Sequence, residues 1–166
     1  LPDAPGLVAL WSVAIEEQFY LAWPVILSLF PLKRLWIPLV CILTGSLVFR
    51  AMNDVPRLHE MHTLSCIGDM ALGGLGAWLI LENATFKSRI ANLPRWFILF
   101  IYLAFAFVFL FRDELLLSSY WLRVFERLIL SAIILLIILE QCFANYSFYK
   151  MGNFRVVTRL GVVTYG

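Results

Sequence analysis

Charged residues are scarce in this sequence. Of its 166 residues only 14% are Asp, Glu, Lys or Arg, whereas 62% are hydrophobic and the mean hydropathy is +0.87. A typical soluble domain has about 25% charged and about 45–50% apolar residues. A water-soluble core of this size has no room for so much apolar surface, so the composition predicts a polytopic membrane protein.

The patterns of several other protein classes are also missing. The formal net charge is only +2 and there is no basic run, which argues against nucleic acid as a partner. The three cysteines, Cys41, Cys66 and Cys142, lie in apolar stretches outside any CxxC pair. They indicate small buried side chains rather than disulfides or a zinc site. We expect no metal and no tightly bound cofactor.

The two ends of the sequence read as internal. Residue 1 is Leu, and no charged leader precedes the first apolar segment. The last residues, RLGVVTYG, stop where another apolar segment begins. We therefore expect residues 1–166 to be part of one membrane domain, with its N-terminal helices and its C-terminal end outside this chain.

Long apolar segments alternate with Pro, Gly and charge. A membrane helix needs about 20 mostly apolar residues to cross a bilayer. The sequence therefore predicts an all-α bundle with about five to six membrane helices, the last beginning near Val156. The other predicted helices are 7–30, 35–52, 63–81, 95–111 and 121–139.

Basic residues predict how these helices are oriented. Lys33 follows the first segment, Lys87 the third and Lys150 the fifth, each with an arginine nearby, whereas the intervening loops have balanced charge. Lys and Arg are enriched in cytoplasmic loops. The Lys33, Lys87 and Lys150 loops are therefore predicted to be cytoplasmic, and the Trp11 end of the first helix to be outside.

Two adjacent carboxylates, Glu16 and Glu17, interrupt the first apolar segment. At 1.5 Å per residue, Glu16 would lie roughly 14 Å along a helix that begins near Leu7, close to the bilayer centre. Ionisable side chains at that depth usually face a cavity or a partner. Two interpretations stay open: the pair lines a reaction or substrate cavity, or it is structural and binds another helix.

Residues 11–24, WSVAIEEQFYLAWP, carry a specific resemblance. They closely resemble the motif W-S-[LV]-x-x-E-E-Q-F-Y-L-x-W-P of the acyltransferase 3 family, integral-membrane O-acetyltransferases that modify bacterial cell-surface polysaccharides. Two weaker matches follow in the family's order. Residues 62–79, HTLSCIGDMALGGLGAWL, resemble its helix T-x-x-R-x-D-A-L-x-x-G-x-L-x-A, with Cys66 and Gly68 in place of Arg and Asp. The final LGVVTYG resembles the start of its L-G-x-x-S-Y-G-x-Y segment.

The resemblance implies a membrane-bound acyltransferase of the bacterial inner membrane. It would move an acyl group, usually acetyl, from acyl-CoA in the cytoplasm to a saccharide hydroxyl outside. The family's catalytic histidine is expected in a helix N-terminal to this chain, so the chain alone is expected to be inactive. Glu16 and Glu17 would support that histidine by fixing its tautomer or orienting the acceptor hydroxyl. The expected substrate-binding residues are Trp11, Ser12, Gln18, Tyr20, Trp23 and Asp69.

Asp69 and the histidines allow more than one interpretation. Asp69 lies in an apolar segment where a charge is costly, so it either has a functional role or pairs with an arginine of the bundle. His59 and His62 flank Glu60, and a polar loop at the membrane surface explains them better than a metal site. Contact with an incoming sugar is a further possibility for them.

Small and basic residues add two weaker predictions. A patch of small residues indicates close helix packing; it consists of Gly73, Gly74, Gly76 and Ala77, with Gly73 and Ala77 four residues apart. Arg155 and Arg159, also four apart, are candidates for binding the phosphates of acyl-CoA, although cytoplasmic topology alone also explains them.

A transporter or flippase subunit is the alternative function. Its buried carboxylates would form a proton relay, which fits intramembrane acids equally well. The sequence shows no sign of the inverted repeats that many transporters contain. The acyltransferase is therefore the favoured interpretation, with the lipid bilayer, acyl-CoA and a saccharide as partners.

Overall fold

The computed structural model contains only helices among the residues that it describes, which confirms the predicted all-α fold. For part of the chain it describes the backbone alone, namely 5–12, 16, 113, 115 and 151. The described residues are 5–53, 55, 59, 62–115, 119–154 and 159.

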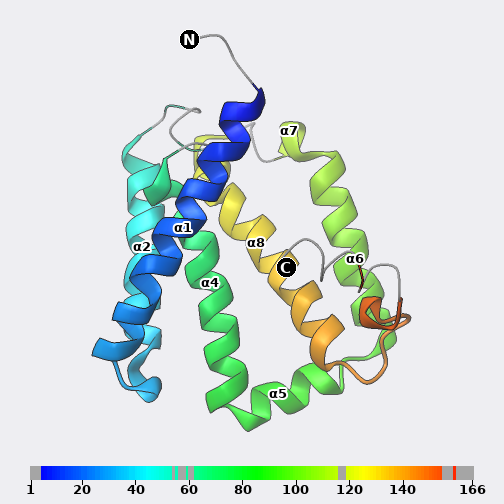
Figure 1. Ribbon diagram of the computed structural model, residues 1–166. Coiled ribbons are helices and arrows are strands. Elements are labelled where there is room, and N and C mark those ends of the chain that lie inside the picture. The colour runs from blue at the N-terminus through cyan, green and yellow to red at the C-terminus, as the bar shows by residue number, and fades with distance from the viewer. Residues whose placement is uncertain are drawn as a thin grey trace.

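The long helices follow the predicted segments closely (Figure 1). They are α1 (Pro5–Leu29), α2 (Trp36–Met52), α4 (Thr63–Glu82), α6 (Arg95–Leu110) and α8 (Tyr120–Phe143). The short helices are η1 (Leu32–Arg34), α5 (Ala84–Ala91), α7 (Arg112–Leu115) and η2 (Met151–Asn153). The sequence predicts a loop where α5 forms, and the segment predicted near Val156 lies outside the described residues.

Side chains and prolines set several helix starts. The Asn83 side chain accepts a hydrogen bond from the Phe86 amide at 2.9 Å, which satisfies a free donor in the first turn of α5. Pro94 stands immediately before α6 in an extended conformation. Asn83 therefore marks the break between α4 and α5, and Pro94 marks the break between α5 and α6.

Fewer helices than predicted are apolar enough to cross a membrane. Among the described residues, Leu32–Met52 and Thr63–Glu82 have the length and composition of a span. A third span arises only if α5 and α6, which are bent by 88° at the break between them, are counted together. The structure thus supports two to three spans and association with a membrane, in place of the predicted five to six.

Polar residues explain the difference in α1 and α8, whereas α6 has only 16 residues and is shorter than the about 20 that a crossing needs. The triplet Glu16, Glu17 and Gln18 lowers the hydropathy of α1. Charged residues do the same in α8, where they are Arg123, Glu126, Arg127 and Glu140.

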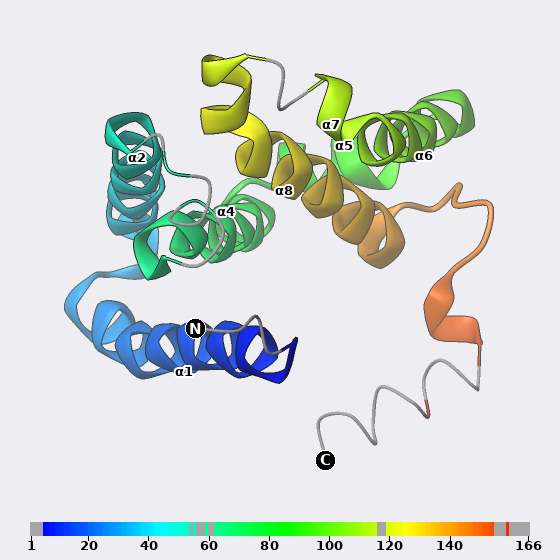
Figure 2. The ribbon, with the colours of Figure 1, turned by 90° about the horizontal axis from the view of Figure 1, so that it is seen from above.

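The central helix of the bundle is α4. It contacts α1, α2, α5 and α8. Seen from above, α4 lies between α1 and α8, and α6 packs on the far side of α8 (Figure 2). Different faces of α4 therefore contact three of the other long helices, α1, α2 and α8.

Glycines let α4 approach its neighbours. A Cβ atom on Gly74 would lie 2.9 Å from a methyl group of Leu39 on α2, and one on Gly76 would lie 2.7 Å from Leu135 on α8. Close packing is therefore confirmed at these two glycines. It is not confirmed at Gly73, where a Cβ atom would have nothing within 4 Å.

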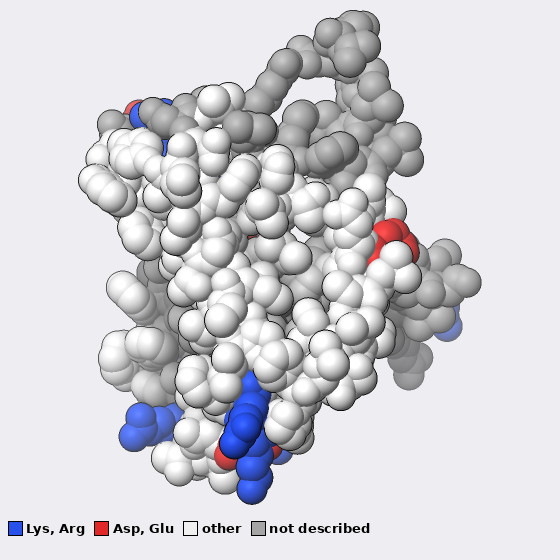
Figure 3. Space-filling view, turned by 90° about the vertical axis from the view of Figure 1, so that its left-hand side faces the viewer, with Lys and Arg blue, Asp and Glu red and all other residues white. Residues whose placement is uncertain are grey.

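The basic segments share one end of the bundle (Figure 1). η1 carries Lys33, α5 carries Lys87, and the segment with Lys150 starts from the same end of α8. Figure 3 shows that the largest groups of Lys and Arg atoms on the α1–α2 side gather at its lower edge, below a mostly uncharged face. The three loops predicted to share one side of the membrane therefore do share one end of the fold.

Candidate functional site: a polar cluster between α2, α4 and α8

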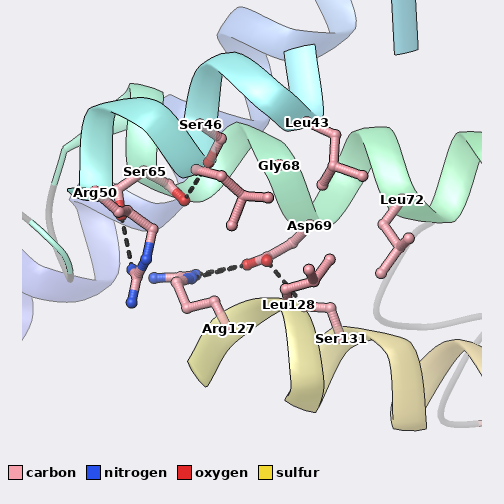
Figure 4. A pocket seen from close by; sticks show the side chains of 11 residues that line it. Leu43, Ser46, Arg50, Ser65, Gly68, Asp69, Leu72, Arg127, Leu128 and Ser131 are labelled. Carbon is pink, nitrogen blue, oxygen red and sulfur yellow. Dashed lines mark hydrogen bonds and ion pairs between the residues drawn. The ribbon is translucent and has the colours of Figure 1, made fainter. Parts of the chain in front are cut away.

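Asp69 of α4 is held by two side chains of α8 (Figure 4). Arg127 donates to Asp69 Oδ2 from Nε at 3.0 Å and from Nη2 at 2.7 Å. Ser131 Oγ donates to Asp69 Oδ1 at 2.8 Å. The side chains of Arg127 and Asp69 are 32% and 31% exposed, so the pair is only partly shielded from solvent. The arginine pairing that the sequence left open for Asp69 is therefore present.

Arg50 of α2 is 2% exposed and joins three helices. Its Nε donates to the Val124 carbonyl at 2.9 Å and its Nη2 to the Arg123 carbonyl at 2.5 Å, both on α8. Its Nη1 donates to Ser65 Oγ on α4 at 2.9 Å and to the His59 carbonyl at 3.2 Å. A guanidinium with this many partners is satisfied in an apolar interior.

Glu126 of α8, 6% exposed, lies between two arginines. It accepts a hydrogen bond from Arg112 Nε of α7, and its Oε2 lies 4.0 Å from Arg50 Nη2. A buried carboxylate is tolerated only where it is paired in this way. Glu126 therefore connects α7 to the three helices that Arg50 joins.

Both histidines of the chain bind helix ends. His59 Nε2 lies 3.1 Å from the Arg50 carbonyl and also contacts the Asn53 carbonyl, at the C-terminus of α2. Because both partners are acceptors, Nε2 carries the proton. His62 Nδ1 accepts a hydrogen bond from the Leu64 amide at 3.2 Å, in the first turn of α4. These contacts give both residues a structural role at the helix termini.

Two cavities meet at the polar cluster around Asp69, called the Asp69 cluster, which includes Arg50, Glu126, Arg127 and Ser131. The smaller, of about 10 Å³, is lined in part by Ser46, Arg50 and Asp69 and is at the lower limit for a single water molecule. The larger has a volume of about 310 Å³. Its lining is Asp69, Arg112, Glu126, Arg127, Leu130, Ser131 and Ile134. With two arginines and two carboxylates in its wall, the larger cavity has balanced charge and suits a polar ligand without net charge.

The motif at 11–24 lies on α1, at the edge of the bundle. Gln18 Oε1 accepts a hydrogen bond from Thr63 Oγ1 of α4 at 3.3 Å. Trp23 is half-buried, stacks on Phe19 with 5.3 Å between the ring centroids, and reaches towards Gly74. Glu17 and Tyr20 are two further predicted site residues of this helix, and both are exposed. For Trp11, Ser12 and Glu16 only the helical backbone is described.

The carboxylate pair lies on α1 near the level at which α4 begins. Gln18 contacts Thr63, which is the first residue of α4, so this part of the motif lies beside one end of the Thr63–Glu82 span. Figure 1 shows that α1 begins beyond the start of α4.

A second buried carboxylate, Glu140, lies near the other end of α8 and is 1% exposed. It accepts hydrogen bonds from Tyr102 Oη and Gln141 Nε2, both at 2.9 Å, and from Ser147 Oγ. These bonds fix the segment after α8 against α6 and α8. Glu140 is remote from the Asp69 cluster and has a structural role.

Sequence reasoning missed most of the polar cluster. The missed residues are Arg50, Ser65, Arg112, Glu126, Arg127 and Ser131. A usable signal was present, because a charged residue inside an apolar segment marks a buried partner or a cavity. Of the two acyl-CoA candidates, Arg159 is exposed and Arg155 lies outside the described residues.

Comparison with protein-family models, curated proteins and solved structures found no match to this chain. The function is therefore inferred from the residues themselves and from their geometry.

Proposed function

We propose that the protein is a membrane acyltransferase that moves an acyl group, usually acetyl, from acyl-CoA to a hydroxyl of a cell-surface saccharide. The observation that carries the proposal is the contact between the two helices that resemble the family. α1 holds the motif at 11–24 and packs on α4, which holds the second match at 62–79. Gln18 contacts Thr63, and Trp23 lies against the backbone of Gly74.

In this proposal α1, α6 and α8 cross the bilayer together with α2 and α4. The charges that lower the hydropathy of α8 are mostly turned inward: Glu126 and Glu140 are buried, and Arg127 is paired with Asp69. Intramembrane charges in such positions face partners within the bundle rather than lipid. Five helices of one bundle can therefore span the bacterial inner membrane although only α2 and α4 would do so on composition alone.

The basic end of the bundle is cytoplasmic in this proposal, because Lys and Arg are enriched on that side. Acyl-CoA would bind there, and Arg155 and Arg159 remain candidates for its phosphates. Residues 16–18 lie towards the opposite, outer end, where the saccharide arrives. This separation suits a reaction that takes its donor from one side and modifies an acceptor on the other.

Each site residue has a distinct role in the proposed reaction. Glu16 and Glu17 support the catalytic histidine expected from the resemblance, which removes the proton from the acceptor hydroxyl. Asp69 faces the 310 Å³ cavity and accepts hydrogen bonds from the saccharide, while Arg127 holds its carboxylate in place. Gln18 and Tyr20, on the exposed side of α1, contribute further polar contacts.

The test is acyl transfer by the full-length protein carrying Glu16→Gln or Glu17→Gln. We expect acetyl-CoA-dependent transfer to surface glycan to fall by about 10²-fold in at least one of them, because the support of the general base is lost. Leu21→Ala is the matched control on the same helix, since Leu21 is 77% exposed. Full activity in both glutamine variants at normal membrane levels would contradict the proposal.

The same preparations separate the enzyme from a transporter. Uptake of a saccharide or other solute that follows an imposed pH gradient, without incorporation of labelled acetyl groups, would favour a proton-coupled carrier instead.

A further inference from the structure

A second open groove lies between α4 and α8, in the half of the bundle next to α5. Its volume is about 330 Å³, and no charged residue is in its lining. The lining includes Gly73, Ala77, Ile80, Leu135, Leu139 and Phe143. Four of these side chains also belong to or pack on the apolar cluster that holds α5 in place, namely Ile80, Leu135, Leu139 and Phe143.

Small residues keep this groove open. A Cβ atom on Gly73 would have nothing within 4 Å, and Ala77 follows one turn later on the same face. At Gly76, by contrast, a Cβ atom would lie 2.7 Å from Leu135. The contact at Gly76 brings α4 and α8 together, and the absence of side-chain bulk at Gly73 and Ala77 leaves a channel beside it.

A lysine lies at the end of the groove. Lys87 of α5 places its Nζ 5.7 Å from the centroid of the Phe143 ring, and Phe143 lines the groove. α5 buries Ile90 and exposes Lys87, and its axis makes an angle of 88° with α6. Figure 1 shows α5 crossing the end of the long helices. A short basic helix with this orientation lies along the membrane surface.

We propose that this groove binds one acyl chain of an anionic phospholipid and that Lys87 binds the phosphate of its headgroup. An uncharged groove between membrane helices fits a hydrocarbon chain, and a cation at the membrane surface fits a phosphate. The charge at one end and the apolar lining elsewhere match a lipid better than a second helix. The lipid site uses none of the residues of the proposed reaction and does not depend on it.

Lipid binding to the purified full-length protein tests this proposal. Native mass spectrometry would compare phosphatidylglycerol with phosphatidylcholine in detergent. We expect phosphatidylglycerol to bind more tightly than phosphatidylcholine. Lys87→Gln should weaken the binding of phosphatidylglycerol about fivefold, to the level of phosphatidylcholine. Gly73→Leu, which fills the groove, is expected to weaken both lipids.

Matched variants control for charge and for bulk. Arg89→Gln removes a cation from the same helix, but residues two apart do not share a helix face, so it should bind lipid as the parent does. Gly45→Leu adds the same side chain at another glycine whose Cβ atom would have nothing within 4 Å. Thermal unfolding of each variant confirms that it is folded, and Lys87→Gln decides the question if Gly73→Leu does not fold.

Three results would overturn the proposal. Equal binding of the two lipids excludes the headgroup contact, and equal effects of Gly73→Leu and Gly45→Leu exclude the groove. If Gly73→Leu instead converts a dimer to a monomer, the occupant is a helix of a second copy and not a lipid.

Discussion

Arg50 illustrates how a full charge is kept inside an apolar bundle. Desolvating a guanidinium is unfavourable by several kcal/mol, unless hydrogen bonds and opposite charge compensate for the lost water. Here four acceptors on α8, α4 and the segment after α2 receive its N–H groups, and Glu126 is 4.0 Å away. The planar, forked shape of the side chain makes this possible, because one group reaches several directions at once.

The first prediction follows from that geometry. In Arg50→Lys the ammonium group cannot reach acceptors on three elements, so buried carbonyls and Glu126 lose their partner. We expect the free energy of unfolding, measured by denaturant titration in detergent, to fall by about 3 kcal/mol. Arg34→Lys is the control because Arg34 is exposed on η1. Equal stability of the two variants would show that Arg50 is not a structural anchor.

The polar cluster could not be derived from the sequence, although its members carry a recognisable signal. Arg50 bonds to Val124, 74 residues away, and Asp69 to Arg127, 58 residues away. Which charge meets which depends on how α2, α4 and α8 pack, and apolar patterning does not specify that. Asp69 stands alone in an apolar segment and could be identified, whereas Arg50 and Arg127 lie close to the ends of their predicted segments.

Helix boundaries, by contrast, were predictable to within a few residues. Apolar runs bounded by Pro, Gly and charge mark where a chain enters and leaves a hydrophobic layer. α5 was missed because its eight residues include Lys87, Ser88 and Arg89 and so resemble a loop. The level of α1 relative to α4 could not be predicted, since a sequence shows how long each helix is and not how far it is shifted along its neighbour.

The packing of α2 on α4 is close at Gly68 as well as at Gly74, and Gly68 gives the second prediction. A Cβ atom on Gly68 would lie 2.8 Å from Ser46 Oγ, and that hydroxyl donates to the Ser65 carbonyl at 3.1 Å. Gly68→Ala must therefore displace Ser46 and break this bond. We expect a loss of about 1–3 kcal/mol in the free energy of unfolding.

Gly45→Ala is the matched control in the neighbouring helix. A Cβ atom at Gly45 would have nothing within 4 Å, so the substitution adds no clash. Because alanine is favoured over glycine inside a helix by about 1 kcal/mol, this variant should be as stable as the parent or more stable. If both alanine variants behave alike, close packing at Gly68 is not what holds α2 against α4.

At the level of the whole molecule, the distribution of charge defines two different ends. η1, α5 and the start of the segment after α8 lie at the basic end, and residues 16–18 lie towards the other. The arrangement agrees with an even number of crossings between successive basic segments, namely α2 and α4 between the first two and α6 and α8 between the last two. It is a property of the fold and is independent of whether the protein is an enzyme.

The third prediction concerns sidedness. With the three native cysteines replaced by serine, single cysteines at Lys33, Arg89 and Lys150 should all resist a membrane-impermeant maleimide applied to intact cells. A cysteine at Val55, between α2 and α4, should react, because Val55 is 51% exposed at the opposite end. If the cysteines at positions 33 and 89 react from opposite sides of the membrane, the helices do not cross it as one bundle.

The most direct test of the account is acetyl transfer in sealed membrane vesicles containing the full-length protein, with the basic end facing the medium. We predict that labelled acetyl-CoA added to the medium gives labelled saccharide inside the vesicles, and that Glu16→Gln or Glu17→Gln lowers this signal about 10²-fold while Leu21→Ala does not. Undiminished transfer in the Glu17→Gln and Glu16→Gln vesicles, or no transfer by the parent protein, would contradict it.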